Sequence, residues 1–385
     1  MTRKLLLTLA ISLTPALFTT ACVAADKAAA PVVAKARWPF AATEFARFDE
    51  PWAMSFLPNG EYLLVTERSG QLKLVALDGS TGEVTGLPEV AYGGQGGLGD
   101  VVLHPDFADN QLVYLSYAEA GPRDTSGAAV ARARLQLDAN GSGKLSGLKV
   151  IWRQVPKVQG QGHFGHRITF GPDGYLWISS GDRQKFDPAQ DMASNLGKVL
   201  RLNDDGSVPK DNPFAADGGV AAQVWSLGQR NPLGLAFNPQ GELWEVEMGP
   251  KGGDELNRIE RGANYGYPIV SNGDHYDGRP IPDHDTQPQF RPPAISWTPV
   301  ISPSSLTFYT GDKFPQWKGN AFISGLSSQS LVRVSFDGDT AREAQRFDMG
   351  ARIRSVAQGP DGDLYLLEDG NNGRLLQLAP PPPSE

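Results

Sequence analysis

A hairpin-like pattern recurs along the chain and constrains its fold more than any other feature. Each copy is an apolar run, a tight turn with Pro and Gly or Asn, and a second apolar run; the cleanest spans 168–179, around Pro172 and Gly174. Proline presets the first central torsion of such a turn, and Gly supplies a positive φ later. The alternation on either side is typical of strands. The other copies lie at 54–65, 101–117, 235–246 and 355–367, with a degenerate copy at 306–323.

These hairpins predict an all-β protein. Gly and Pro account for 44 and 30 of the 385 residues, a density that breaks the periodicity of a helical bundle. The copies start roughly 45 to 75 residues apart, a spacing typical of propellers or arrays. Further strand-like runs lie at 71–75, 197–202 and 374–378. Six copies of about four strands each predict a six-bladed β-propeller, which hides its edges by closing radially. A pair of β-sandwiches is the alternative.

The domain organisation follows from the repeats. No linker divides them, so we expect one catalytic propeller domain at 38–378, followed by a disordered tail at 379–385. The stretch 271–299 is rich in Asp, Pro and His and has no strand pattern. It is expected to be an insertion on one face, where long loops often carry function.

The N-terminus has the features of an export signal. In residues 1–25, Arg3 and Lys4 precede a short apolar stretch and a small-residue cleavage site, which predicts a signal peptide, and 26–37 is predicted to be a flexible lead-in. The protein is therefore expected to be periplasmic or secreted. The alternative is a lipid anchor through Cys22, the only cysteine. Cleavage after residue 25 would leave no thiol, which excludes disulfides and cysteine-based metal sites.

Charge and motif searches exclude several function classes. The formal net charge is -8, and no run of Lys or Arg is present, so nucleic acid is not an expected partner. The segments 94–99 and 160–165 match G-x-G-x-x-G, but strand-like residues follow each of them. Dinucleotide binding needs a helix there, because the phosphate lies at the helix N-terminus. No zinc-protease, P-loop or nucleophile-elbow motif is present.

Candidate functional residues lie in the loops between strands. His163 lies in a Gly-rich loop before a strand, where a neutral imidazole could act as a general base; a structural role is the alternative. Acidic residues cluster at 245–255 around Gly249 and Pro250. Carboxylates and main-chain carbonyls suit Ca²⁺, with a solvated acidic loop as the alternative.

Basic residues indicate a second kind of ligand. Arg230 stands beside the amide of Asn231 in a loop, and Arg352 and Arg354 are two apart on a predicted strand, so their side chains point the same way. An anionic ligand near the centre of the ring would explain these cations, although exposed Arg pairs are also common.

Long ordered stretches give the chain a family resemblance. The most specific are 197–213, with Gly-Lys-Val-Leu-Arg-Leu-Asn, and 227–237, with Leu-Gly-Gln-Arg-Asn-Pro-Leu-Gly-Leu-Ala-Phe; 247–257 and 262–268 continue them. Together they resemble the soluble aldose sugar dehydrogenases of the quinoprotein glucose dehydrogenase family, which use pyrroloquinoline quinone (PQQ). The resemblance covers most of the chain, from Pro51 to Leu378. The family is six-bladed, which agrees with the repeat count.

The resemblance implies a PQQ-dependent oxidation of an aldose sugar at C1 to a lactone, with electrons passed to an external acceptor. It implies that His163 is the base, and that Arg230 stabilises charge developing on the quinone. It also implies cofactor contacts from Gln95 and Asn231, and cofactor-carboxylate contacts from a pair of arginines. These two are Arg352 and Arg354.

Calcium is the second cofactor that the resemblance implies. The carbonyls of Gly249 and Pro250 match ligands of the Ca²⁺ that holds PQQ, and Glu255 and Tyr265 match a second, structural Ca²⁺ site in some members.

Two positions depart from the best-known members. Gly162 stands where those members have an Asp before the base, and Ser327 stands where they supply a Lys to the cofactor. The preferred sugar, the natural electron acceptor and the oligomeric state are not assigned. A calcium-dependent lactone hydrolase and a non-catalytic sugar-binding propeller are the alternative functions; the first would need metal without quinone, and the second would not need His163.

Overall fold

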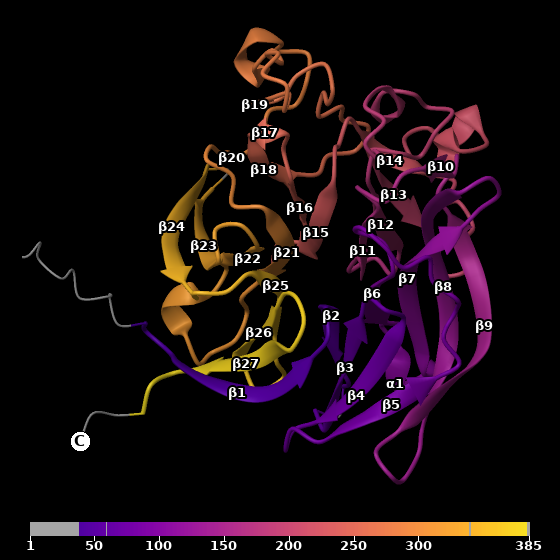
Figure 1. The fold of residues 1–385 in the computed structure, drawn as a ribbon. Helices are drawn as coiled ribbons and strands as arrows, with labels where there is room; N and C mark the ends of the chain where they lie inside the picture. The colour runs from indigo at the N-terminus through magenta and orange to yellow at the C-terminus, as the bar shows by residue number, and fades with distance from the viewer. Residues whose placement is uncertain (1–37, 59, 339, 383–385) are drawn as a thin grey trace, which may run out of the picture. The chain divides into compact units, whose positions relative to one another are not determined.

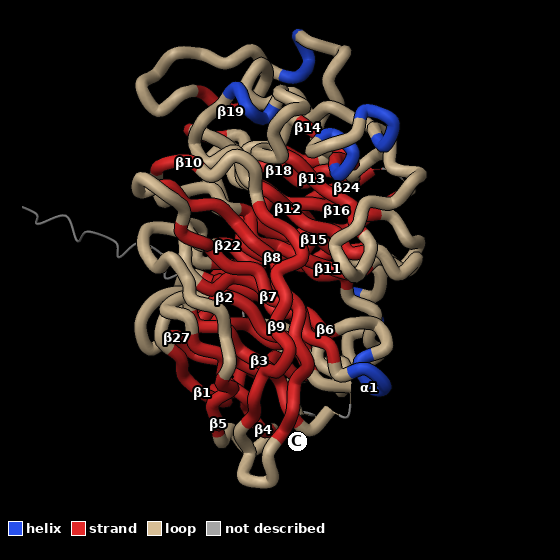
Figure 2. The backbone as a smooth tube through the Cα atoms, turned by 90° about the vertical axis from the view of Figure 1, so that its right-hand side faces the viewer, coloured by secondary structure: helices blue, strands red, loops and turns tan. Residues whose placement is uncertain are grey.

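The computed structural model describes residues 38–58, 60–338 and 340–382. From Trp38 onward the chain forms one compact unit whose regular secondary structure is almost entirely strand, and its short helical turns lie in the connecting loops (Figure 2). Within this described part, no helix has the length and apolar character needed to cross a membrane. The predicted signal peptide, the lead-in and Cys22 lie outside the described residues.

The strands form antiparallel groups of four. A nine-stranded sheet contains two of them, joined by a parallel pairing of β5 with β9 and extended by β10 (Val158–Gln159), which pairs with β8. The first group is β2 (Pro51–Phe56), β3 (Tyr62–Glu67), β4 (Gln71–Ala76) and β5 (Thr81–Thr85). The second is β6 (Leu98–Leu103), β7 (Leu112–Ala120), β8 (Thr125–Leu137) and β9 (Gly143–Arg153), with helix α1 (Phe107–Asn110) between its first strands.

Four separate sheets follow, each with four strands. The third group is β11 (Gly165–Phe170), β12 (Leu176–Ser180), β13 (Lys198–Leu202) and β14 (Val224–Leu227). The fourth is β15 (Pro232–Phe237), β16 (Leu243–Glu247), β18 (Asp254–Arg258) and β20 (Ile295–Trp297). The fifth is β21 (Pro303–Phe308), β22 (Ala321–Gly325), β23 (Ser330–Asp337) and β24 (Thr340–Asp348). The last is β25 (Ile353–Gln358), β26 (Leu364–Glu368), β27 (Gly373–Ala379) and the N-terminal β1 (Ala41–Phe48).

The first strands of these groups contact one another in a closed cycle. The order is β2, β6, β11, β15, β21 and β25, and β25 returns to β2 (Figure 1). The strand β1 pairs with β27, so both ends of the described chain contribute to the last sheet. A closed arrangement of this kind removes the unpaired edges that an open sheet would expose.

Each predicted hairpin is an antiparallel pair in the structure. The copy at 168–179 is β11 with β12, and the degenerate copy at 306–323 is β21 with β22. Two details were wrong. The stretch 271–299 is not free of strands, because Ile295–Trp297 forms β20 and Gly273–Asp274 forms β19, which pairs with β17 (Lys251–Gly252). The predicted tail starts too early by one residue, since Ala379 pairs with Ala41.

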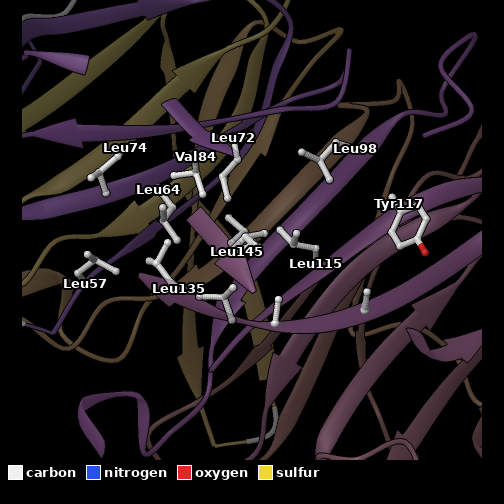
Figure 3. Packing of buried hydrophobic residues seen from close by; sticks show 14 of the residues in the cluster. Leu57, Leu64, Leu72, Leu74, Val84, Leu98, Leu115, Tyr117, Leu135 and Leu145 are labelled. Carbon is white, nitrogen blue, oxygen red and sulfur yellow. The ribbon is translucent and has the colours of Figure 1, made fainter. Parts of the chain in front are cut away.

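Apolar side chains fill the spaces between neighbouring groups. Leu57, Leu64 and Leu72 of the first group pack with Leu98 and Leu115 of the second (Figure 3). Alternate residues of a strand point to opposite faces, so each sheet can pack against both neighbours. Fully burying a Leu side chain stabilises a fold by about 1.5–3 kcal/mol. This repeated packing fixes the positions of the first strands of the six groups, which contact one another in the cycle and are called the innermost strands below.

Each innermost strand also carries a β-bulge near its start. The register with its partner shifts between Pro51 and Ala53 in β2 and between Gly165 and Ile168 in β11. Equivalent shifts occur near the starts of β6, β15, β21 and β25. A bulge leaves a residue unpaired and changes the direction of its side chain. These bulges matter for the site described below.

We expect deletion of residues 1–48 to destabilise the protein, because it removes β1 and exposes the edge of β27. It also removes the buried Phe40 and Phe48, each of which contributes about 1.5–3 kcal/mol. Urea unfolding followed by tryptophan fluorescence measures the loss. A chain that begins at Trp38 is the matched control, since it keeps β1. Equal stability of the two chains would contradict this role of β1.

Candidate active site

The six groups of strands surround a cavity, each with the same one of its edges. In an antiparallel hairpin, the start of the first strand and the end of the second meet at the same edge. The cavity has a volume of about 360 Å³ and lies at this edge. Its lining includes the starts of first strands and the loops after second strands: Trp52, Arg68, Gly94, Gln95, Phe164, Gly165, His166, Asn231, Leu233, Met248, Ser302, Leu326, Arg352, Arg354 and Asp369. We call it the axial cavity.

The bulges direct side chains into the axial cavity. Trp52, Leu233 and Arg354 occupy the unpaired positions of β2, β15 and β25, and His166 lies in the bulge of β11. All of these residues line the cavity. Residues from several sheets therefore converge because the same irregularity recurs in each innermost strand.

Positive charge predominates on the cavity lining. Among the described lining residues, three are Arg and one is Asp. Asp369 accepts hydrogen bonds from Arg352 Nε at 2.8 Å and from Arg354 Nε and Nη2 at 2.9 and 2.7 Å. Arg68 pairs with Glu50 at 3.0 Å. Because Asp369 compensates only part of this charge, the cavity suits an anionic ligand.

Two amides lie at the boundary of the axial cavity. Gln95 Oε1 accepts a hydrogen bond from the backbone N–H of His163 at 2.7 Å. Asn231 is 1% exposed, and neither its Oδ1 nor its Nδ2 has a partner among the described residues. Buried polar groups are normally hydrogen-bonded, so the unpaired Asn231 amide indicates a ligand position.

A second pocket, of about 280 Å³, contains His163. It is lined by Gln184, Phe186, Arg230, Pro250, Tyr267, His275, Tyr276, Asp277 and Arg279 as well as His163. Gln95 lines the axial cavity and binds the backbone of His163, and Asn231 follows Arg230 in the chain. The axial cavity and this second pocket, which we call the His163 pocket, therefore share a wall.

Asp182 orients His163. Its Oδ1 lies 2.7 Å from His163 Nδ1. The same carboxylate also accepts hydrogen bonds from the backbone N–H of Gln184, at Oδ1 and 2.9 Å, and from that of Phe186, at Oδ2 and 3.2 Å. Burial lowers the pKa of His163, and nearby Arg230 lowers it further, while Asp182 acts in the opposite direction. A neutral imidazole that donates from Nδ1 to Asp182 keeps Nε2 as a proton acceptor. Such a pair can act as a general base.

Arg230 connects this pocket to a group of buried carboxylates. Its Nη1 donates to the carbonyls of Met248 at 2.9 Å and Gly249 at 2.7 Å. Its backbone N–H and that of Asn231 both donate to Glu247 Oε2. Arg230 also lines a small hollow with Gly249, Pro250, Glu255 and Tyr265. The predicted metal ligands therefore lie together, next to the cation predicted to act at the cofactor.

The carboxylates behind this hollow are almost fully buried. Burial raises the pKa of Glu247 to about 7, and it also raises the pKa values of Glu245 and Glu255, with a further contribution from Glu247. Asn257 Nδ2 donates to both Glu245 and Glu255. Glu245 Oε1 and Asn257 Oδ1 have no partner in the described structure. Hard oxygen donors of this kind fit Ca²⁺ in chemical type.

The hydroxyl of Tyr265 is already engaged in hydrogen bonds within the protein. It donates to the carbonyl of Arg258 and accepts from the N–H of Glu260, and the carbonyl of Tyr265 lies 3.0 Å from His284 Nε2. The described residues contain no cluster of three or more His, Cys, Asp or Glu side chains in a metal-binding arrangement. A cation here could take main-chain oxygens of Gly249 and Pro250 as ligands beside Glu255.

Comparison with known proteins identifies the family. The model of the glucose/sorbosone dehydrogenase family matches residues 48–377. The aldose sugar dehydrogenase YliI of Escherichia coli is 41% identical over 340 residues, which cover 87% of this chain and 91% of the relative. The chain belongs to the glucose/sorbosone dehydrogenase family. Quinoprotein glucose dehydrogenase B of Acinetobacter calcoaceticus is 28% identical over 404 residues and is matched over 84% of each chain.

Solved structures of the family agree with this assignment. The crystal structure of the soluble aldose sugar dehydrogenase of Escherichia coli in the apo-form has a TM-score of 0.83 at 39% identity, with 89% of this chain and 100% of that chain covered. The PQQ-bound aldose sugar dehydrogenase of Streptomyces coelicolor has a TM-score of 0.73 at 28% identity, with 88% and 98% covered. The family and the enzyme class predicted from the sequence are confirmed.

Gly162, one departure from the best-known members of the family, lies beside the flexible side chain of Gln184. A Cβ added at Gly162 would lie 2.6 Å from the side chain of Gln184, so a larger residue would need that side chain to move. Asp182, from the loop after β12, orients His163. The other departure, Ser327, is exposed and bonds Ser302 at 2.7 Å; Arg68 is an additional cation on the cavity lining.

Sequence analysis missed Asp182, Asp369 and Arg68. Each follows the second strand of a hairpin by one or two residues, after β12, β26 and β3 respectively. Gly249 and Pro250 occupy the corresponding loop after β16. Charged residues just beyond these strands were therefore a usable signal for the site edge.

We expect Asp182→Ala to loosen the loop after β12, because the backbone N–H groups of Gln184 and Phe186 lose a buried acceptor. A loss of about 1–3 kcal/mol in the free energy of unfolding is expected. Hydrogen exchange of the 181–186 segment measures the local effect. Asp277→Ala is the control, since Asp277 is exposed and pairs with exposed Arg279. Unchanged exchange in Asp182→Ala would contradict the assignment.

Proposed function

We propose that this protein is a PQQ- and Ca²⁺-dependent dehydrogenase that oxidises aldose sugars at C1 to lactones and passes the electrons to an external acceptor. The observation that carries the proposal is the His163–Asp182 pair in a pocket that adjoins the cationic axial cavity through Gln95. A base positioned by a buried carboxylate suits removal of a hydroxyl proton. The relatives named as aldose sugar and quinoprotein glucose dehydrogenases support the same reaction.

The axial cavity fits PQQ, which is a flat aromatic molecule with three carboxylates. Arg68, Arg352 and Arg354 could receive those carboxylates, since Arg binds carboxylate in a planar, bidentate way. The unpaired amide of Asn231 offers a donor and an acceptor, and Gln95 is fixed nearby by His163. The resemblance had already implied cofactor contacts for all of these residues except Arg68, which the structure adds.

Each protein group has a separate role in the proposed oxidation of the sugar. PQQ, when bound, supplies the acceptor for the hydride that leaves C1 of the sugar. His163 Nε2 takes the proton of the C1 hydroxyl, while Asp182 holds the ring and stabilises the resulting imidazolium. Arg230 lines both the His163 pocket and the small hollow of Gly249 and Pro250, and its fixed positive charge there stabilises negative charge that develops during the reaction.

Calcium is proposed to bind the oxygen-rich wall beside Arg230. The carbonyls of Gly249 and Pro250 and the carboxylate of Glu255 are hard donors. The Gly249 carbonyl also accepts from Arg230, and a carbonyl oxygen has two lone pairs, so the cation would share this oxygen. A divalent cation would let the buried carboxylates ionise, which offsets the desolvation that raises the pKa of Glu247.

Architecture and location complete the proposal. The six groups of strands and their cyclic contacts support a six-bladed β-propeller with the axial cavity at its centre. Residues 1–25 support export to the periplasm or beyond, with a lipid anchor on Cys22 as the alternative. The electron acceptor is proposed to be external.

Reconstitution tests the cofactor requirement directly. Protein stripped with EDTA is mixed with PQQ alone, Ca²⁺ alone or both, and reduction of an artificial dye is followed with several aldoses. We expect turnover only with both cofactors. Hydrolysis of a lactone with Ca²⁺ alone would instead support the hydrolase alternative. Absence of dye reduction with every aldose tested, although PQQ is bound, would contradict the proposal.

We expect His163→Gln to lower kcat by roughly 10²-fold or more, as is typical for loss of a general base. The rate of the wild type should stay level near pH 7 and fall below pH 6.5, because the base must be neutral and the pKa of His163 is lowered from its usual value. Steady-state rates across pH measure both effects. His104→Gln, in the turn after β6, is the control and should keep full activity.

A further inference from the structure

A second buried histidine lies on the lining of the axial cavity, and the proposed chemistry does not use it. His166 is 3% exposed, and neither ring nitrogen has a hydrogen-bond partner in the described part of the chain. Leaving a buried polar group unpaired costs about 1–3 kcal/mol. Such a group in a native structure calls for an explanation, and here both ring nitrogens are unpaired.

The backbone holds His166 in place at a further cost. Its φ is 73°, in the left-handed region that non-glycine residues rarely adopt, and Gly165 before it has a φ of 80°. Strained residues of this kind concentrate at functional sites. The strain belongs to the bulge of β11, which places the ring on the cavity lining.

Aromatic rings fix the orientation of the imidazole. It stacks on Phe164 at a centroid distance of 5.2 Å with planes 12° apart, and Trp52 meets it edge-on at 5.9 Å. Buried arginines brace both rings: Arg183 lies 3.7 Å from the centre of Phe164, and Arg167 lies 4.3 Å from that of Trp52. We call Trp52, Phe164 and His166 the aromatic floor.

The His166 ring is neutral. Burial, followed by the charges of Arg183 and Arg167, lowers the pKa of His166 to about 3. A neutral imidazole has one N–H donor and one acceptor nitrogen. A water molecule would need two to four polar partners to be held there, whereas Leu233 and Met248 add apolar surface to the aromatic floor.

We propose that His166 is a further cofactor-binding residue, whose ring N–H donates a hydrogen bond to an oxygen of bound PQQ from the aromatic floor. The inference rests on the proposed function, because it needs PQQ in the axial cavity. PQQ carries many acceptor oxygens, so a neutral donor without a partner complements it. The floor also offers flat aromatic surface to a flat ligand.

The test compares PQQ affinity in two variants of the full chain. His166→Phe keeps a flat ring but removes both nitrogens, and His166→Gln keeps a donor. Quenching of tryptophan fluorescence by PQQ, in the presence of Ca²⁺, gives Kd. We expect His166→Phe to weaken PQQ binding about tenfold, the loss of one hydrogen bond to a charged ligand, and His166→Gln to recover part of it. His104→Gln should bind as the wild type does.

Melting of the PQQ-free protein separates binding from folding. Since His166→Phe removes unpaired polar atoms, its Tm without PQQ should equal or exceed that of the wild type. Wild-type affinity in His166→Phe would overturn this inference alone and indicate water at the ring nitrogens. A lower Tm of both variants without PQQ, together with an equal loss of PQQ affinity in His166→Phe and His166→Gln, would overturn it too, because the ring would then act through folding. Failure of the wild type to bind PQQ would overturn the proposed function as well.

Discussion

The bulge at the start of each innermost strand is the constraint on which the site depends. In a regular strand, side chains alternate between the two faces of the sheet, and both faces here pack against neighbouring sheets. The unpaired residue of a bulge escapes that alternation. Because the six innermost strands contact one another in a cycle, side chains such as Trp52, His166 and Arg354 meet in one cavity.

Buried or half-buried carboxylates hold the charged groups that surround this cavity. Asp369 holds Arg352 and Arg354, Asp182 holds His163, and Glu247 accepts the backbone N–H groups of the Arg230 loop. In the low dielectric of the interior such hydrogen bonds are strong and directional. The reacting groups are therefore positioned before any ligand binds, which lowers the cost of reorganisation during the reaction.

The hairpins could be predicted from the sequence because turn residues and strand alternation are local signals. The copy at 168–179 shows both, and the structure pairs it as β11 with β12. The three-residue strand Ile295–Trp297 was missed because it follows two prolines and is too short to show alternation. Asp182 and Asp369 were missed for another reason: their partners lie 19 and 15–17 residues away in the chain, in other loops or strands.

The sequence by itself determined the strand-rich class, the repeated hairpins and the family, since all of these depend on residues close together in the chain or on long matching stretches. Only the tertiary structure decided which loops share an edge, which carboxylate orients His163, and that His166 lies on the cavity lining. The physical reason is that ring closure joins distant segments: His166 lies against Trp52 of another sheet, and its unpaired nitrogens depend on that packing.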